Sequence, residues 1–360
     1  MMRYRPPTPV QRCLLRGVAG TAILAVGFPL ASPAAFAAPN DTFAVTATIP
    51  VTGTAEGIAI SPDGTRAFAT HGEESAGQLS VIDTTSRTVL RTIAVGNFPV
   101  GVAVSPDGRI VYVGNNGDDT LSVIDTATNT VTATVSVGDG PLGVAVTPNG
   151  SKVLIASQFD GHLTIIDTAT NTVTHTLAVG GTAMFLAITP DGRTAYITGI
   201  DGHSIAVVDI ATATLTGRLP TPSAPVTIDI TDNGRTLYVA ESTDRSSQVT
   251  IIDTATGSVT ATIPVAEGAT GIDVAPDGHT VYIAHSTPTN AVTVLDTATR
   301  AISATVPITA NGQLVAVTPN SADAYVTSQF DTISVISNTS APTGPPGTPG
   351  SGSLGTIFGS

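Results

Sequence analysis

The chain offers little material for disulfide bonds or thiolate metal sites, because it contains a single cysteine, Cys13. Cys13 precedes an apolar run, whereas a lipid-anchored cysteine would follow one. Downstream of that run the chain has no cysteine, so disulfides, thiolate-bound metals and covalently attached haem are excluded there. An ordinary hydrophobic core must hold the chain together, and 360 residues are enough to bury one.

Basic residues are also scarce, with 14 lysines and arginines against 27 aspartates and glutamates. Four of the arginines lie within the first 16 residues, and the ten other basic residues are scattered singly. An acidic surface repels phosphate backbones, so nucleic-acid binding would need a strong local basic patch. The composition therefore argues against a nucleic-acid partner.

The N-terminal residues are ordered as in a secretory signal peptide. The four arginines precede the apolar stretch 17–36, and small residues flank Phe36 at its end. A membrane anchor is the alternative, because a spanning helix needs ~20 apolar residues. Pro29 and Pro33 interrupt the stretch and favour cleavage. We therefore predict a signal peptide over residues 1–37, a secreted or extracytoplasmic protein at the cell surface or in a periplasm-like space, and no membrane span after cleavage.

The other end of the chain, residues 338–360, is rich in proline, glycine, serine and threonine. Such a composition predicts a flexible tail. Its last apolar residues, Leu354, Ile357 and Phe358, suggest a docking peptide as the alternative to a simple disordered end.

Between these ends, one phrase hinged on Pro-Asp-Gly recurs seven times at spacings of 42 to 44 residues. Such a regular period indicates an array of one supersecondary unit. A second landmark, Ile-Asp-Thr or a variant, follows each hinge in the same register and also counts seven. The hinges begin at Ser61, Ser105, Thr147, Thr189, Thr231, Ala275 and Thr318.

Each unit contains four short runs rich in valine, isoleucine and threonine, bounded by turn residues, as residues 101–137 illustrate. No run is long enough for a helical stripe, so the units are predicted to be four-stranded. The hinge glycine supplies the positive φ of a hairpin turn, Asp125 is expected to cap backbone N–H groups, and Asn129 to take the left-handed position. The repeated aspartates are thus interpreted as turn chemistry rather than catalysis.

Seven four-stranded units form either a closed propeller or an open stack, and the period favours the propeller. The run at 43–51 matches a fourth strand with nothing before it, while the seventh unit ends after three strands. We therefore predict an all-β, seven-bladed β-propeller over residues 38–337, whose N-terminal strand completes the last blade and closes the ring.

The tetrads Tyr112–Asn115, Tyr196–Gly199 and Tyr325–Ser328, with the hinge before and Val-Ile-Asp-Thr or its variants after, resemble the YVTN-repeat β-propeller family. The absence of tryptophan separates the chain from WD-repeat propellers. The resemblance implies a propeller found in secreted and surface-layer proteins as an interaction module, while related propellers serve lactonases and redox enzymes. The fourth tetrad position varies here, so no uniform role carries over to it.

Two functions are weighed. The first is a non-catalytic binding or interaction scaffold, whose partner is a protein, a cell-envelope component or a small amphipathic ligand. The alternative is a lactonase- or lyase-like enzyme with a polar funnel site. A redox role lacks ligands in the chain, and no cofactor or metal is predicted. Fold does not choose among these classes.

A candidate site emerges when two positions are compared across the seven copies. The residues entering the first strand should share one end of the ring with those ending the second. On this face, units two to five present an apolar lip, and units six, seven and one present polar residues, as an amphipathic ligand requires. The apolar residues are Val100, Leu142, Met184 and Val226, and the polar ones are Thr270, His285, Gln313, Ser328, Glu56 and His71.

Ligand or partner binding is expected to centre on Glu56, His71 and His285. Two alternatives stay open: these are solvated loop residues sorted by chance, or the two histidines and the glutamate hold a metal.

Overall fold

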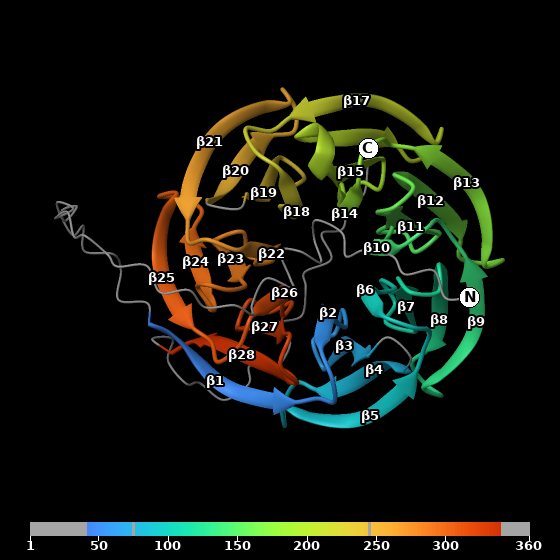
Figure 1. Cartoon of the computed structure of the whole chain (residues 1–360), viewed down its shortest axis with the longest axis horizontal. Helices are drawn as coiled ribbons and strands as arrows, with labels where there is room; N and C mark the ends of the chain where they lie inside the picture. The colour runs from blue at the N-terminus through green and yellow to red at the C-terminus, as the bar shows by residue number, and fades with distance from the viewer. Residues whose placement is uncertain (1–41, 74–75, 244–245, 340–360) are drawn as a thin grey trace, which may run out of the picture.

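The computed structural model describes residues 42–73, 76–243 and 246–339. Over these residues, 28 strands form seven four-stranded antiparallel sheets arranged as blades around a central axis (Figure 1). The predicted seven-bladed propeller is thus confirmed. The predicted signal peptide at 1–37 and residues 340–360 of the predicted tail lie outside the described residues.

Each blade runs from an innermost strand beside the axis to an outermost strand at the rim. Blade 1 contains β2 (Ala55–Ile60), β3 (Arg66–Glu73), β4 (Ala76–Asp83) and β5 (Thr88–Ala94). Blade 2 contains β6 (Pro99–Val104), β7 (Ile110–Asn115), β8 (Thr120–Asp125) and β9 (Thr130–Ser136). Blade 3 contains β10 (Pro141–Val146), β11 (Lys152–Ser157), β12 (His162–Asp167) and β13 (Thr172–Ala178).

The other blades follow the same order. Blade 4 contains β14 (Ala183–Ile188), β15 (Thr194–Gly199), β16 (Ser204–Asp209) and β17 (Thr214–Pro220), with a short 3₁₀ turn, η1 (Ile200–Gly202), after β15. Blade 5 contains β18 (Pro225–Ile230), β19 (Thr236–Ser242), β20 (Ser247–Asp253) and β21 (Ser258–Val265). Blade 6 contains β22 (Ala269–Val274), β23 (Thr280–His285), β24 (Ala291–Asp296) and β25 (Ala301–Pro307).

Blade 7 joins the two ends of the described chain. It contains β26 (Gly312–Val317), β27 (Asp323–Ser328), β28 (Thr332–Asn338) and, as its outermost strand, β1 (Phe43–Pro50). β1 pairs antiparallel with β28 from Phe43 opposite Asn338 to Pro50 opposite Thr332. The N-terminal strand therefore closes the ring, as the incomplete first and last repeats predicted.

The turns have the predicted chemistry. The hinge glycine Gly108 has a φ of 72° and Asn129 a φ of 56°, both in the left-handed region. The Asp125 carboxylate accepts from the backbone N–H groups of Ala127 and Thr128 at 3.0 and 2.7 Å. The Thr128 contact is the first cause of a lowered Asp125 pKa. These aspartates thus hold turns, as the repetition indicated.

Neighbouring blades pack face to face through apolar side chains. Between blades 3 and 4, for example, Leu154 and Ile165 pack against Leu186, Ile197 and Val208, all buried. The hydrophobic core is therefore divided into similar layers, one between each pair of neighbouring blades, and these layers are arranged in a ring around the axis.

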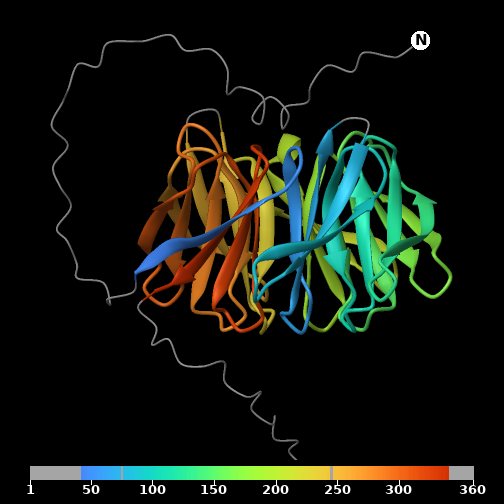
Figure 2. The ribbon, with the colours of Figure 1, turned by 90° about the horizontal axis from the view of Figure 1, so that it is seen from below.

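The ring has two faces, visible from the side in Figure 2. The Pro-Asp-Gly turns and the turns between third and fourth strands share one, here named the hinge face. The loops between second and third strands, and those that lead from one blade to the next innermost strand, share the other, the funnel face. Within the described ranges, no helix is long and apolar enough to cross a membrane.

Candidate functional site

Seven residues share one register position, near the start of each innermost strand, at the funnel-face end of the ring around the axis, which is here called the mouth. They are named the mouth residues: Glu56, Val100, Leu142, Met184, Val226, Thr270 and Gln313. Figure 1 shows the seven innermost strands surrounding the axis, so this position comes from every blade in turn. The sequence comparison selected all seven.

One side of the mouth is apolar. Val100, Leu142 and Met184 come from three consecutive blades, yet their side chains pack into one buried cluster. Phe98 and Phe185, both partly buried, pack against it. Val226, the fourth predicted apolar residue, is half-buried and is not part of this cluster. The three residues therefore form one buried apolar cluster over blades 2 to 4, and their part in ligand binding stays a prediction.

The other side of the mouth carries Glu56, which is only 7% exposed. Burial raises the pKa of its carboxyl to about 7, and no hydrogen bond from the described residues opposes that effect. Its backbone is fixed across the ring closure, because the Thr327 hydroxyl of blade 7 donates to the Glu56 carbonyl at 2.7 Å. The backbone of Glu56 is thus held in place, and burial of the side chain brings its pKa to about 7.

Gln313 occupies the mouth position in the adjoining blade 7, and Thr270 occupies it one blade further on, in blade 6. Gln313 is 4% exposed, and its amide nitrogen Nε2 has no hydrogen-bond acceptor among the described residues. The Thr270 hydroxyl is already engaged with the backbone carbonyls of Gly312 and Ala284 at 2.9 and 3.2 Å. Glu56 and Gln313 therefore supply the unfilled polar groups of the mouth, and Thr270 supports the strand edge.

In blades 1 and 2 the residue at the fourth tetrad position anchors the loop that leads into the blade. In blade 2 the Asn115 amide oxygen accepts from the Gly96 backbone N–H at 3.1 Å. His71 occupies the same position in blade 1, where its Nδ1 contacts the Thr52 carbonyl oxygen at 2.6 Å and its Nε2 contacts the Ser80 hydroxyl at 2.7 Å. Different residue types thus perform one task, which is to anchor the incoming loop.

The histidines predicted at the centre of the site are buried within their blades. His71 is 1% and His285 0% exposed, and Nε2 of His285 contacts the Thr293 hydroxyl at 2.8 Å. Burial lowers the His285 pKa to about 4, so the ring is neutral at pH 7. Ser328 is buried too, and its hydroxyl donates to the Thr332 carbonyl at 2.8 Å. Their part in ligand binding stays a prediction, and it would act through the loops they hold.

The channel wall carries an acidic pair that the sequence comparison missed. At the position three residues after the mouth residue, five innermost strands have alanine, whereas β18 has Asp229 and β22 has Asp273. Asp229 accepts from the Val274 backbone N–H at 2.7 Å, and Asp273 accepts from that of Val317 at 2.6 Å. Each aspartate therefore caps the free edge of the next blade's innermost strand.

The two carboxyl groups also hydrogen-bond each other. Loss of solvation raises the pKa of both, and the Asp229 charge raises that of Asp273 further. Two carboxylates this close cannot both ionise readily, so the pair shares a proton. The signal was present in the sequence, because these aspartates stand in a strand at a position otherwise filled by alanine.

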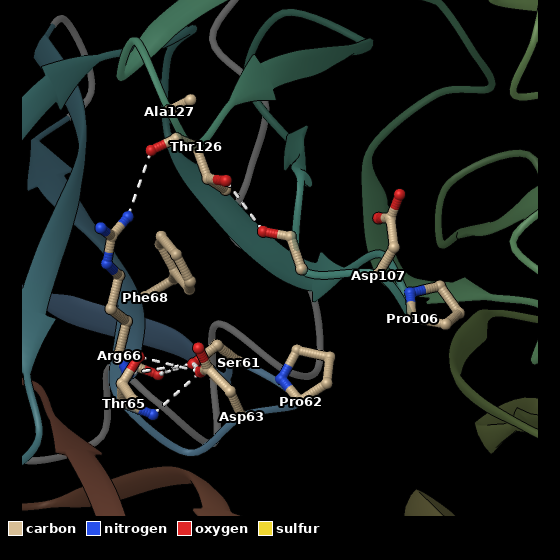
Figure 3. Close-up of a pocket in the computed structure, with 11 residues that line it drawn as sticks. Ser61, Pro62, Asp63, Thr65, Arg66, Phe68, Pro106, Asp107, Thr126 and Ala127 are labelled. Atoms are coloured by element: carbon tan, nitrogen blue, oxygen red, sulfur yellow. Dashed lines mark hydrogen bonds between the residues drawn. The ribbon is translucent and has the colours of Figure 1, made fainter.

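A separate groove opens on the hinge face between blades 1 and 2, with a volume of about 570 Å³. Figure 3 shows Arg66 crossing it to the Thr126 carbonyl, a contact of 3.1 Å. At the preceding junction, the Tyr325 hydroxyl binds the equivalent carbonyl, that of Thr84, at 3.2 Å. Phe68 replaces the tyrosine in blade 1, so the groove lies where a hydroxyl is missing.

No group of three or more histidine, cysteine, aspartate or glutamate side chains suited to a metal ion occurs in the described part of the chain. Glu56, His71 and His285 therefore do not form such a group there.

Comparison with known proteins supports the fold. The family model described as "Lactonase, 7-bladed beta-propeller" matches residues 68–184, from β3 of blade 1 to the start of blade 4. Among solved structures, hydrazine synthase of Kuenenia stuttgartiensis is similar with a TM-score of 0.74 and 23% sequence identity, over 80% of this chain and 96% of that one. At that identity the likeness concerns the fold alone. No curated protein matches the chain.

Proposed function

We propose that the protein is a secreted or cell-surface binding scaffold that holds an amphipathic ligand at the mouth of its channel. The observation that carries the proposal is the buried Glu56 carboxyl, whose raised pKa has no hydrogen bond among its causes, together with Gln313 Nε2, which has no acceptor among the described residues. Both lie on one side of a mouth whose other side is the Val100–Leu142–Met184 cluster. Buried polar groups normally have partners, so unfilled ones favour a ligand. Export rests on the N-terminal pattern and on the YVTN-like repeats.

The donor and acceptor pattern narrows the ligand's polar group. Gln313 Nε2 can only donate, while Glu56 accepts when ionised and donates when protonated. A hydroxyl or amide both donates and accepts, so it can satisfy both residues at once. A carboxylate meets repulsion from ionised Glu56. We therefore expect a neutral amide or alcohol head group with an apolar tail on the cluster.

Isothermal titration calorimetry of the mature protein with octanamide tests this proposal. We expect binding by the wild type and a loss of about tenfold or more in the Glu56→Leu/Gln313→Leu double variant. Octanoate should bind more weakly than octanamide. An Asp277→Asn variant on the hinge face serves as control and should bind like the wild type. Equal binding of octanamide by all three proteins would contradict the proposal.

Lactone hydrolysis is the second candidate, favoured by the family-model match and by the Glu56 carboxyl. A carboxyl whose pKa is about 7 exchanges protons efficiently at neutral pH, as a general acid or base must. Titration of the acid released from γ-octalactone tests this role. Turnover that disappears in Glu56→Gln supports the enzyme, and absence of turnover in a protein that binds octanamide supports the scaffold.

A further inference from the structure

Charge is sorted between the two faces of the ring. The funnel-face loops of the described chain contain no lysine or arginine, but they expose five acidic side chains: Asp118, Asp160, Asp201, Glu267 and Asp331. The described basic residues lie on the hinge-face side or in outer strands instead, at Arg66, Arg87, Arg91, Arg109, Lys152, Arg193, Arg218, Arg235 and Arg300. The charged side chains that the described funnel-face loops expose are thus acidic, and one cation from an outer strand, the Arg218 guanidinium, reaches the rim at the Val179 carbonyl.

Aromatic side chains interrupt this acidic rim. The sequence Ser-Gln-Phe-Asp occurs twice, at 157–160 in blade 3 and 328–331 in blade 7, each time in the loop between second and third strands. Phe330 is 64% exposed, the highest value of any large apolar residue described, and Phe159 is 36% exposed. Blades 3 and 7 lie across the propeller from each other in Figure 1, so the loops that carry the two phenylalanines lie on opposite sides of the mouth.

The mouth lies between these two loops. Gln313 is nine-tenths buried there with its amide nitrogen unfilled, next to Glu56 of the adjoining blade. Phe98 and Phe185 continue the apolar surface on the side of blades 2 to 4. A path across the funnel face therefore passes from an exposed aromatic ring, over a half-polar mouth, to a second aromatic ring, with acidic side chains around it.

We propose that the funnel face docks a basic peptide segment of a partner protein, laid across the mouth between Phe159 and Phe330. Its cationic side chains meet the rim carboxylates, and its apolar side chains contact the two phenylalanines and the mouth cluster. Its backbone amides offer the paired donor and acceptor that Glu56 and Gln313 lack. This inference rests on the proposed function, because the same mouth residues contribute.

A basic peptide fits better than the other acidic-surface ligands. A small cation would use one or two carboxylates, but the exposed acids are spread over five blades and only an extended chain reaches several of them. Apolar side chains give that chain a reason to rest on Phe330, which a fully hydrated polycation lacks.

The test uses a dodecapeptide of lysine, leucine and glycine, and a counterpart with glutamate in place of each lysine. Binding to the mature protein is measured by fluorescence anisotropy. The basic peptide should bind, the acidic one should not, and raising the salt from about 50 to about 500 mM should weaken binding about tenfold. Equal binding of both peptides, or no salt effect, overturns the inference.

Matched variants locate the surface. Glu267→Gln/Phe330→Ser/Asp331→Asn removes two acids and one exposed ring from the funnel face, and should weaken peptide binding at least about tenfold. Asp63→Asn/Leu90→Ser/Asp277→Asn removes the same kinds of groups from the hinge face and the outer strand β5, and should bind like the wild type. Equal loss in both variants overturns the inference.

Octanamide separates the two proposals. A wild type that binds octanamide but not the basic peptide loses this inference and keeps the proposed function. A wild type that binds neither loses both.

Discussion

The Thr327 hydroxyl donates to the Glu56 carbonyl at 2.7 Å and accepts from the Leu314 backbone N–H at 3.1 Å. It thereby links blade 7 to blade 1 at the junction where the ring closes, and fixes the strand that presents the Glu56 carboxyl. Thr198 makes the same pair of contacts between blades 4 and 5, with Phe185 and Val226. One bridge therefore serves the polar side of the mouth and its copy serves the apolar side.

Thr327→Val should lower the free energy of unfolding by about 1–3 kcal/mol, because it leaves a buried N–H and a carbonyl unpaired. It should also weaken octanamide binding, because the Glu56 strand loses its anchor. Thr198→Val is the matched control, expected to cost similar stability with a smaller effect on binding. Chemical denaturation and titration calorimetry measure the two effects. If both variants lost octanamide affinity equally, Thr327 would have no specific role in positioning Glu56.

The closure strand should be indispensable. Deleting β1 exposes the edge of β28 and uncovers Ile333 and Val335, so we expect aggregation during purification. Deleting residues 340–360 should leave melting unchanged. Size-exclusion chromatography and thermal melting compare the two truncations. If the protein without β1 stays monomeric and melts like the full chain, ring closure does not stabilise it.

Arg66 is expected to replace the hydroxyl that Phe68 lacks at the junction of blades 1 and 2. Arg66→Met should cost about 0.5–1.5 kcal/mol by freeing the Thr126 carbonyl. Adding Phe68→Tyr to that variant should restore most of the loss, whereas Phe68→Tyr alone should gain little, because Arg66 still occupies the carbonyl. A double-mutant cycle measured by denaturation gives the coupling. If the stability effects of the two substitutions were additive, Arg66 would not be replacing the missing tyrosine hydroxyl.

The same logic applies to Lys152, which donates to the Ile210 carbonyl at 3.0 Å where Leu154 replaces the tyrosine. A cation at the start of the second strand thus accompanies the loss of the hydroxyl at two junctions.

The Asp229–Asp273 pair should make stability depend on pH. The folded state raises the pKa of Asp273, so it binds more protons than the unfolded state. The pair's contribution to stability is then full below pH ~4 and is lost as pH rises toward the folded pKa. Asp273→Asn keeps the hydrogen bonds without the ionisation. Its stability relative to the wild type should therefore increase as pH rises above about 4.

Denaturation from acid to neutral pH measures this difference. Asp63→Asn is the control of opposite sign, because the Ser61 hydroxyl lowers the Asp63 pKa and its contribution is present above pH ~4. Parallel pH curves for the wild type and Asp273→Asn would show that no proton is shared.

The fold followed from the sequence because its determinants are local and repeated. Hinge turns such as that at Gly108 and capped turns such as that at Asp125 recur in each copy, so every unit predicts the same hairpins. The closure followed from where the first and last copies are cut, at Phe43 and Ser337. The pairing of β1 with β28 was the one long-range contact to infer, and the two incomplete copies indicated it.

The site followed only in part. Glu56 and Gln313 were selected as candidates because the mouth position lies next to the axis in every copy. His71 was predicted to bind ligand on the funnel face but is buried within its blade, because successive strand residues point to opposite sides: the Thr70 hydroxyl contacts the next innermost strand and the His71 ring contacts the incoming loop. Asp229 was missed because aspartates elsewhere hold turns. Its position in a strand, not its residue type, distinguishes it.

Met184 offers the most direct test, since it is the only methionine in the described residues and lies in the apolar cluster of the mouth. Its ¹³C-labelled methyl signal is assigned by its loss in Met184→Leu. The signal should shift saturably with octanamide, and Glu56→Leu/Gln313→Leu should abolish the shift. A Met184 signal that does not move while octanamide binds would place the ligand elsewhere and contradict the account.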